Sequence, residues 1–165
     1  MRSNSRQFGL TYLNADEAGR YLEKCSGHVL GVIGFGRKTS LPLTGCAPLW
    51  VDIPVLDGRD SSIEIWTSDV RVTTSEHRGI SGSANGKVLF GSLSLEQYAG
   101  GTLEKLAFEA YTRIFEFIDH HDYRNLLRVW HYFPQINDDE DGLERYRGFN
   151  VGRHAAFVSA GRSIG

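Results

Sequence analysis

The sequence is poor in cysteine and has no long apolar run, and these shortages exclude two kinds of protein. Cys25 and Cys46 are its only two cysteines, and they are not in CxxC spacing, so no disulfide framework is expected. We interpret both as ordinary buried thiols of a reducing compartment. The apolar runs are too short to cross a bilayer, and the first residues lack the apolar stretch of a signal peptide. We therefore expect a soluble, cytoplasmic protein.

Neither sign of charge predominates, which argues against a highly charged partner. Lys and Arg number 18 and Asp and Glu 20, for a formal net charge of −2. Such a balance supplies no field that would hold nucleic acid or an anionic membrane surface. Hydrophobic residues make up 41% and aromatic residues 12% of the 165 residues, enough to build the core of one domain. We expect residues 1–165 to form a single domain.

The common catalytic motifs are missing as well. The Gly-x-Ser-x-Gly pattern occurs at Gly161–Gly165, but it follows a helical pattern and is not an elbow between a strand and a helix; no His-x-x-x-His helix pair is present. Neither a hydrolase triad nor zinc chemistry is therefore indicated. The segment Gly31–Thr39 has the composition of a phosphate loop, but Arg37 separates its last glycine from Lys38. No helix start follows it either. We interpret the segment as a glycine-bearing strand that another part of the chain approaches closely.

The order of periodic segments predicts an α+β fold with a mostly antiparallel or mixed sheet. Runs that favour strands are separated by Gly, Pro, Ser and Asp; they are His28–Phe35, Leu49–Ile53, Ile63–Thr67, Val70–Thr74 and Lys87–Leu95. From Thr102 to His120 the apolar spacing becomes that of an amphipathic helix. Thr102 is expected to cap its start, and the pair His120-His121 suits its carbonyl end.

An acidic cluster separates this helix from a second one. Asn125–Phe133 is a further apolar run that Pro134 ends, and the four acids at 138–141 precede a helical pattern over about Gly142–Ala160. We interpret the acids as the start of that helix. Four consecutive acids cannot converge on one cation without a glycine among them to make the turn, so no metal site is predicted. Because a sheet-and-helix protein that stopped here would leave surfaces uncovered, we expect a piece of a longer protein.

The second helical pattern carries the candidate site. At about 100° per residue, Asn150 and Arg153 fall inside an apolar stripe formed by Leu143, Tyr146, Phe149, Ala156, Phe157 and Ala160, and outside it lie Glu144, Arg145, Arg147 and Gly152. A guanidinium in such a stripe must meet an acid, carbonyl groups or an anionic ligand. An internal salt bridge or a side chain that reaches out to solvent is one explanation. The other is a receptor for a ligand carboxylate, which the planar fork of Arg matches, with a phenol donor from Tyr146.

Two neighbouring segments resemble the chorismatase family, namely LRVWHYFPQIN at 127–137 and GLERYRGFNVGR at 142–153. They are also similar to the chorismate-lyase-type 3-hydroxybenzoate synthases, often called pteridine-dependent dioxygenase-like. The resemblance implies YjgF/RidA-like units, each a sheet with two helices on one face, in trimer-like packing. It further implies cofactor-free cleavage of the enolpyruvyl ether of chorismate. Pyruvate would be released with a dihydroxycyclohexadiene carboxylate or a hydroxybenzoate.

The resemblance also implies where the chemistry lies. Family members are longer and carry their acid/base glutamate in a carboxy-terminal half that this chain lacks, so the catalytic residue remains unknown here. Tyr146, Arg153 and Asn150 are the predicted substrate contacts; chorismate, a carboxy-terminal domain and a homotrimer are the implied partners. Two other hypotheses remain. The chain is a RidA-like small-molecule-binding or enamine/imine deaminase module, or it is a non-catalytic interaction domain in which Arg153 pairs internally.

Overall fold

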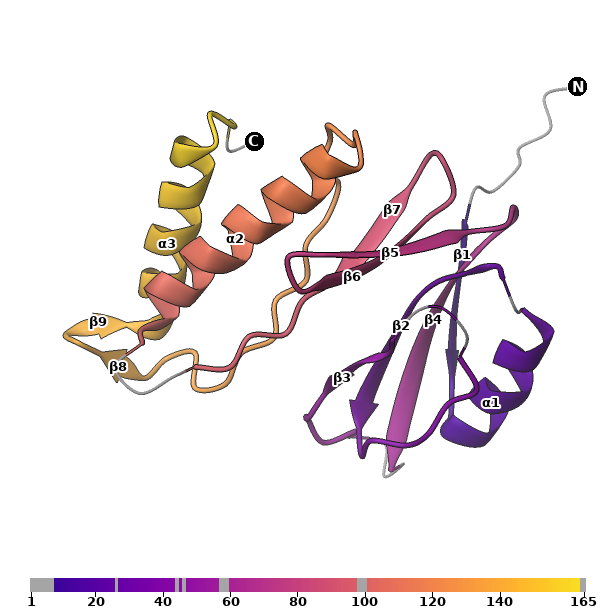
Figure 1. Cartoon of the computed structure of the whole chain (residues 1–165). Helices are drawn as coiled ribbons and strands as arrows, with labels where there is room; N and C mark the ends of the chain where they lie inside the picture. The colour runs from indigo at the N-terminus through magenta and orange to yellow at the C-terminus, as the bar shows by residue number, and fades with distance from the viewer. Residues whose placement is uncertain are drawn as a thin grey trace, which may run out of the picture. The chain divides into compact units, whose positions relative to one another are not determined.

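A computed structural model describes residues 8–25, 27–43, 45, 47–56, 60–97 and 101–163, so the prediction for Cys46 lies outside the described residues. The chain falls into two compact units (Figure 1), one of residues 1–77 and 81–92 and the other of residues 78–80 and 93–165. Helices and separate sheets occur together, which confirms the α+β class. Among the described residues, no helix has the length and apolar character needed to cross a membrane.

The first unit is built on a four-stranded sheet in the order β1-β4-β2-β3. Its strands are β1 (Phe8–Leu13), β2 (Val29–Gly36), β3 (Leu49–Val51) and β4 (Ser61–Ser68). β4 runs antiparallel to both neighbours, whereas β2 and β3 are parallel. Helix α1 (Ala15–Lys24) lies along this sheet (Figure 1) and buries Ala18 and Leu22 in one core cluster with Ile63 and Ile65. A second sheet contains β5 (Thr73–His77), β6 (Ile80–Ala84) and β7 (Leu89–Ser92).

Four of the five predicted strands are confirmed as β2, β3, β4 and β7 with small shifts at their ends, whereas β5 begins later than the predicted Val70–Thr74 run. The prediction missed β1, β6 and α1. Helix α1 nevertheless has a clear start signal, because Asn14 accepts the N–H of Glu17 at 2.9 Å and the Glu17 carboxylate accepts the N–H of Asn14 at 3.3 Å. This reciprocal capping box stabilises a helix start. The helix was overlooked because only Ala18 and Leu22 are buried, which leaves little apolar periodicity.

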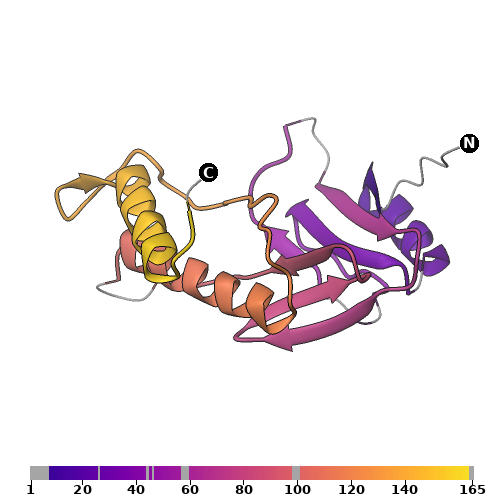
Figure 2. The same ribbon diagram turned by 90° about the horizontal axis from the view of Figure 1, so that it is seen from above.

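The second unit is built on two helices, α2 (Leu103–His120) and α3 (Arg145–Ser159), which lie side by side in both views (Figures 1 and 2). The side chain of Thr102 accepts the N–H of Lys105 at 3.3 Å, and helix α2 ends at His120 with His121 as its cap. Both predictions for α2 are therefore confirmed. The segment after α2 returns along the helices to the hairpin of β8 (Asp139–Glu140) and β9 (Leu143–Glu144) (Figure 2).

The interpretation of the acidic cluster as a helix start is wrong. Asp139 and Glu140 form β8, and α3 begins only at Arg145. Asp141 and Gly142 make the hairpin turn with φ values of 56° and 80°, and a two-residue turn of this kind favours the Asp-Gly pair. Asp139 Oδ1 accepts the N–H of Gly142 at 2.9 Å. The apolar run at 125–133 forms neither a strand nor a helix.

Gly152 sets the distance between α2 and α3. A Cβ atom built at this position would overlap the backbone carbonyl group of Glu104 on α2. At Gly148, one turn earlier on the same helix, the nearest atom of Glu104 would be 3.8 Å away, an ordinary van der Waals distance of about 3.5–4.0 Å. The absent side chain at 152 therefore permits the two helix backbones to meet.

We expect Gly152→Ala to destabilise the protein and Gly148→Ala, its matched control, to stabilise it. At 152 the added methyl group pushes on backbone atoms, which costs about 1–3 kcal/mol of unfolding free energy or more. At 148 the methyl group fits, and replacing a helix glycine gains up to about 1 kcal/mol. Urea unfolding followed by circular dichroism measures both changes. Equal stability of the two variants would contradict the close approach of the helices.

Candidate functional site

Arg145 is the buried arginine of α3, so the prediction that it lies outside the apolar stripe is wrong. Only 8% of the residue is exposed; it forms an ion pair with Glu140 and donates from Nη2 to Gln97 Oε1 at 3.0 Å. The buried residues of α3 are Arg145, Gly148, Phe149, Gly152 and Ala156. This face differs from the predicted stripe by about one residue, because the contact of α2 with Gly152 turns the glycine inward.

The Glu140 carboxylate joins the starts of the two helices. Its Oε2 accepts the N–H of Leu103, the first residue of α2, at 2.5 Å, and its Oε1 accepts from Gln97 Nε2 at 2.8 Å. Burial favours the neutral acid, but the hydrogen bonds from Leu103 and Gln97 and the charge of Arg145 lower the pKa of Glu140 below its ordinary value. Glu140 therefore satisfies the N–H at the start of α2, and not at the start of the helix that the acidic cluster was predicted to begin.

Arg153 lies two turns beyond Arg145, at the edge of the buried face of α3. The residue is half-buried, its Nε is buried without a hydrogen-bond partner, and its guanidinium carbon lies 5.9 Å from the centroid of the Phe149 ring. Among the described residues of this unit, five arginines form ion pairs with carboxylates, namely Arg78, Arg113, Arg145, Arg147 and Arg162. Within the described ranges no carboxylate pairs with Arg153, so its charge is not neutralised there.

Two uncharged polar side chains, those of Tyr111 and His131, pack against the same Phe149 ring as this guanidinium. The Tyr111 hydroxyl and Nε2 of His131 are 2.9 Å apart, and the Tyr111 residue is only 4% exposed. Burial raises the pKa of Tyr111, an effect that the positive charge of Arg153 partly opposes. Burial of the ring and then the same charge lower the pKa of His131. Both groups are therefore uncharged at neutral pH, which leaves Arg153 as the charge of this cluster.

The other two predicted contacts lie on the same helix but make no described contact with Arg153. Tyr146 is 48% exposed, and the side-chain amide of Asn150 donates to the Tyr146 carbonyl oxygen at 2.9 Å. Tyr111 and His131 were not predicted as site residues. Tyr111 offered a signal, because a tyrosine at a core-facing helix position needs a partner for its hydroxyl.

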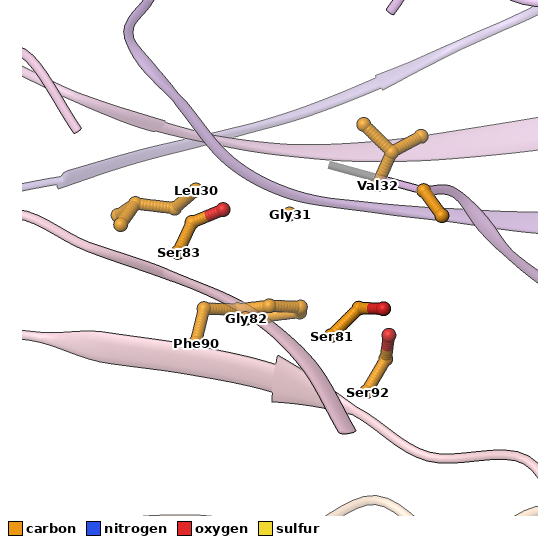
Figure 3. A pocket seen from close by; sticks show the side chains of 9 residues that line it. Leu30, Gly31, Val32, Ser81, Gly82, Ser83, Phe90 and Ser92 are labelled. Carbon is orange, nitrogen blue, oxygen red and sulfur yellow. The ribbon is translucent and has the colours of Figure 1, made fainter. Parts of the chain in front are cut away.

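A small cavity lies in the first unit (Figure 3). The hydroxyl groups of Ser81, Ser83 and Ser92 and the ring of Phe90 border it, and Gly31 of β2 forms part of its lining. Its volume is about 10 Å³, which is room for roughly one water molecule. A Cβ atom at Gly31 would overlap the Phe90 ring, which confirms the prediction of a glycine-bearing strand with a close neighbour. The cavity is too small for a ring-sized substrate.

Metal and thiol chemistry find no support in the described part of the chain. No group of three or more His, Cys, Asp or Glu residues there is placed to hold a metal ion. Cys25 is a free, half-buried thiol packed against the core of the first unit. Arg153 with Tyr111 and His131 is therefore the candidate ligand-binding cluster, and the charge of its guanidinium suits an anionic ligand.

The cluster lies in the part of the chain that matches a known protein family. The family described as Chorismatase FkbO/Hyg5-like, N-terminal, matches residues 64–164. A 3-hydroxybenzoate synthase of Streptomyces hygroscopicus is 26% identical over 152 residues, which are 90% of this chain and 44% of that protein. A chorismatase of Streptomyces rapamycinicus is 34% identical over 106 residues, 62% of this chain and 30% of that protein.

A solved structure extends the similarity to the fold of nearly the whole chain. The crystal structure of a chorismatase superposes with a TM-score of 0.75 at 28% sequence identity, over 94% of this chain and 46% of that one. The chain thus spans less than half the length of these relatives.

We expect Glu140→Gln to destabilise the protein at neutral pH and to remove part of its acid sensitivity. Removing one partner of a buried ion pair costs about 3–5 kcal/mol. Because the pKa of Glu140 is lowered in the folded state, its ionised form stabilises the fold above about pH 4.5, and this contribution is lost as the pH falls further. Urea unfolding between pH 7 and pH 3 measures it. A wild type and a variant that lose stability in parallel over this range would contradict the role of Glu140.

Proposed function

The chain belongs to the FkbO/Hyg5-like chorismatase family, whose amino-terminal part it matches over residues 64–164, and we propose that it is the amino-terminal part of an enzyme that cleaves chorismate. The bond broken is the enolpyruvyl ether, and pyruvate is one product. The observation that carries the proposal is Arg153, a half-buried guanidinium with no carboxylate partner in the described chain. Its surroundings suit one end of a dicarboxylate.

The reaction needs a fixed anion site and a proton donor. Chorismate carries two carboxylates, and ether cleavage begins when a proton is delivered to the enolpyruvyl methylene group while positive charge develops on the adjacent carbon. Water adds to that carbon, and the bond from the carbon to the ether oxygen then breaks. The oxygen stays on the ring as a hydroxyl group, which releases pyruvate and a dihydroxycyclohexadiene carboxylate. Loss of pyruvate without net consumption of water gives a hydroxybenzoate instead. A carboxylic acid with a raised pKa would supply the proton, and we assign no such acid among the residues of this chain.

Arg153 serves in this proposal as the receptor for a substrate carboxylate. Its planar fork forms two parallel hydrogen bonds with a carboxylate, and holding the dianion in one orientation favours the reacting geometry. Tyr146 and Asn150 share its helix, and we retain both as proposed contacts. The interaction-domain hypothesis required an internal partner for Arg153, and the described residues offer it no acid. No observation favours the deaminase hypothesis.

We expect Arg153→Ala in the full-length protein to raise KM for chorismate by roughly 30-fold or more, since losing one member of a hydrogen-bonded charge pair costs about 2–5 kcal/mol. Arg153→Lys keeps the charge but not the fork, and we expect an intermediate KM. A coupled assay for pyruvate measures the rates. Mass spectrometry identifies the second product, because the two candidates differ by one water molecule.

Arg147→Ala is the matched control on the same helix. The Arg147 side chain is 73% exposed and pairs with Glu144 at 3.4 Å, and surface ion pairs of this kind contribute about 0–1 kcal/mol. Its KM should stay within about twofold of wild type. Equal KM values for wild type and Arg153→Ala would remove Arg153 from the site, and a full-length protein that releases no pyruvate would refute the proposed function.

A further inference from the structure

The Tyr111 side chain is held rigidly in an aromatic cluster that includes Phe149, the ring that the Arg153 guanidinium also contacts. The Tyr111 ring packs 5.5 Å from Phe157, 5.8 Å from Phe115 and 6.4 Å from Phe149, measured between ring centroids. Tyr111 is 4% exposed, so the phenol cannot turn to solvent without opening this aromatic cluster. His131 packs against Phe149 as well, with a centroid distance of 4.7 Å and an interplanar angle of 67°. The hydroxyl and the imidazole are therefore fixed relative to α3.

The chemistry of the three groups sets the direction of their hydrogen bonds. A guanidinium has only N–H donors, so it can meet Tyr111 only through the phenol oxygen as acceptor. Tyr111, His131 and the Arg153 guanidinium all pack around the Phe149 ring, and the charge of Arg153 acts on the phenol. The phenol must then donate its own proton elsewhere, and Nε2 of His131 lies 2.9 Å away. This nitrogen accepts a proton only in the uncharged imidazole.

The environment keeps both neighbours in the required protonation states. Burial and the charge of Arg153 lower the pKa of His131, which preserves its acceptor nitrogen at neutral pH. Burial raises the pKa of Tyr111, which preserves its donor proton. The resulting chain runs from Arg153 to Tyr111 to His131 and contains no negative charge. A carboxylate in the place of Tyr111 would also hold the guanidinium, but it would compete with an anionic ligand.

We propose that Tyr111 and His131 are positioning residues for Arg153, which orient its guanidinium without neutralising it and so leave its charge to the carboxylate of the ligand. This inference rests on the proposed function for its ligand, though not for its geometry. It explains why two polar groups, the Tyr111 hydroxyl and the His131 imidazole, lie in an otherwise apolar contact between α2, α3 and the segment that follows α2. Neither side chain needs to touch the substrate.

The first test compares steady-state kinetics of the full-length protein with chorismate. Tyr111→Phe keeps the ring and removes the hydroxyl, and we expect KM to rise roughly 10-fold, the usual effect of losing a hydrogen bond to a charged group. We expect kcat to change by less than about threefold. His131→Gln retains an acceptor and should restore most of the affinity that His131→Leu loses. Because the residues act in one chain, Tyr111→Phe combined with His131→Leu should raise KM no more than the larger single effect.

Phe157→Leu is the structural control. Phe157 packs on both Tyr111 and Phe115 but has no polar atom in the chain of hydrogen bonds. Its replacement should lower thermal stability and leave KM within about twofold of wild type. If Phe157→Leu raises KM as much as Tyr111→Phe does, the effect is a general loosening of the cluster, and the positioning role is refuted.

A second readout needs no activity. In full-length protein labelled with ¹⁵N-arginine, the Nε–H resonance of Arg153 can be assigned by its absence in Arg153→Lys. We expect Tyr111→Phe to shift and broaden this resonance, because the guanidinium loses its anchor, whereas Phe157→Leu should leave it sharp. An unchanged Nε–H resonance in Tyr111→Phe overturns the proposal. Absence of pyruvate release by the wild type would refute the proposed function alone, and the resonance would still decide the positioning role.

Discussion

The Glu140 carboxylate is the contact on which the second unit depends. The first N–H groups of a helix have no partner inside it, and a buried guanidinium requires an anion. Glu140 meets both needs, because it accepts the N–H of Leu103 at the start of α2 and pairs with Arg145 at the start of α3. The two helices are thereby joined at one end, and Gly152 brings their backbones together further along. Arg153 is the residue after Gly152, so these contacts fix its position.

The three arginines of α3 differ in how their charge is neutralised. Arg145 is buried with its carboxylate, and Arg147 is exposed with its own. Arg153 lies between these extremes, half-buried against Phe149 with uncharged neighbours in the described chain. A protein that only needed to satisfy this guanidinium would place an acid beside it. Uncharged neighbours instead hold it at a cost in stability, which is reasonable where an anionic ligand completes the site.

Much of the fold was predictable where the signal is local. Helix α2 has a cap at Thr102 and an apolar period sustained over 18 residues, and such a long periodic segment leaves little ambiguity. The prediction for the acidic cluster failed because two local rules compete there: acids favour a helix start, whereas Asp141-Gly142 favours a tight hairpin turn. The hairpin prevailed because it brings Glu140 to Arg145 and to α2. Helix α1 was missed because its apolar stripe is narrow, although its capping box was readable.

The sequence by itself determined the α+β class, the two long helices, the resemblance to chorismatases and the choice of Arg153 as a guanidinium in need of an anion. These follow from local spacing and from residue chemistry. Only the tertiary structure decided that Arg145 is the buried, paired arginine and that Tyr111 and His131 pack with Arg153 around Phe149. Such partners come from segments far apart in the chain. In addition, rotating a helix about its axis by about one residue changes which side chain faces the core. The local sequence pattern of α3 does not predict that rotation, because it depends on the contact between the backbones of α2 and α3.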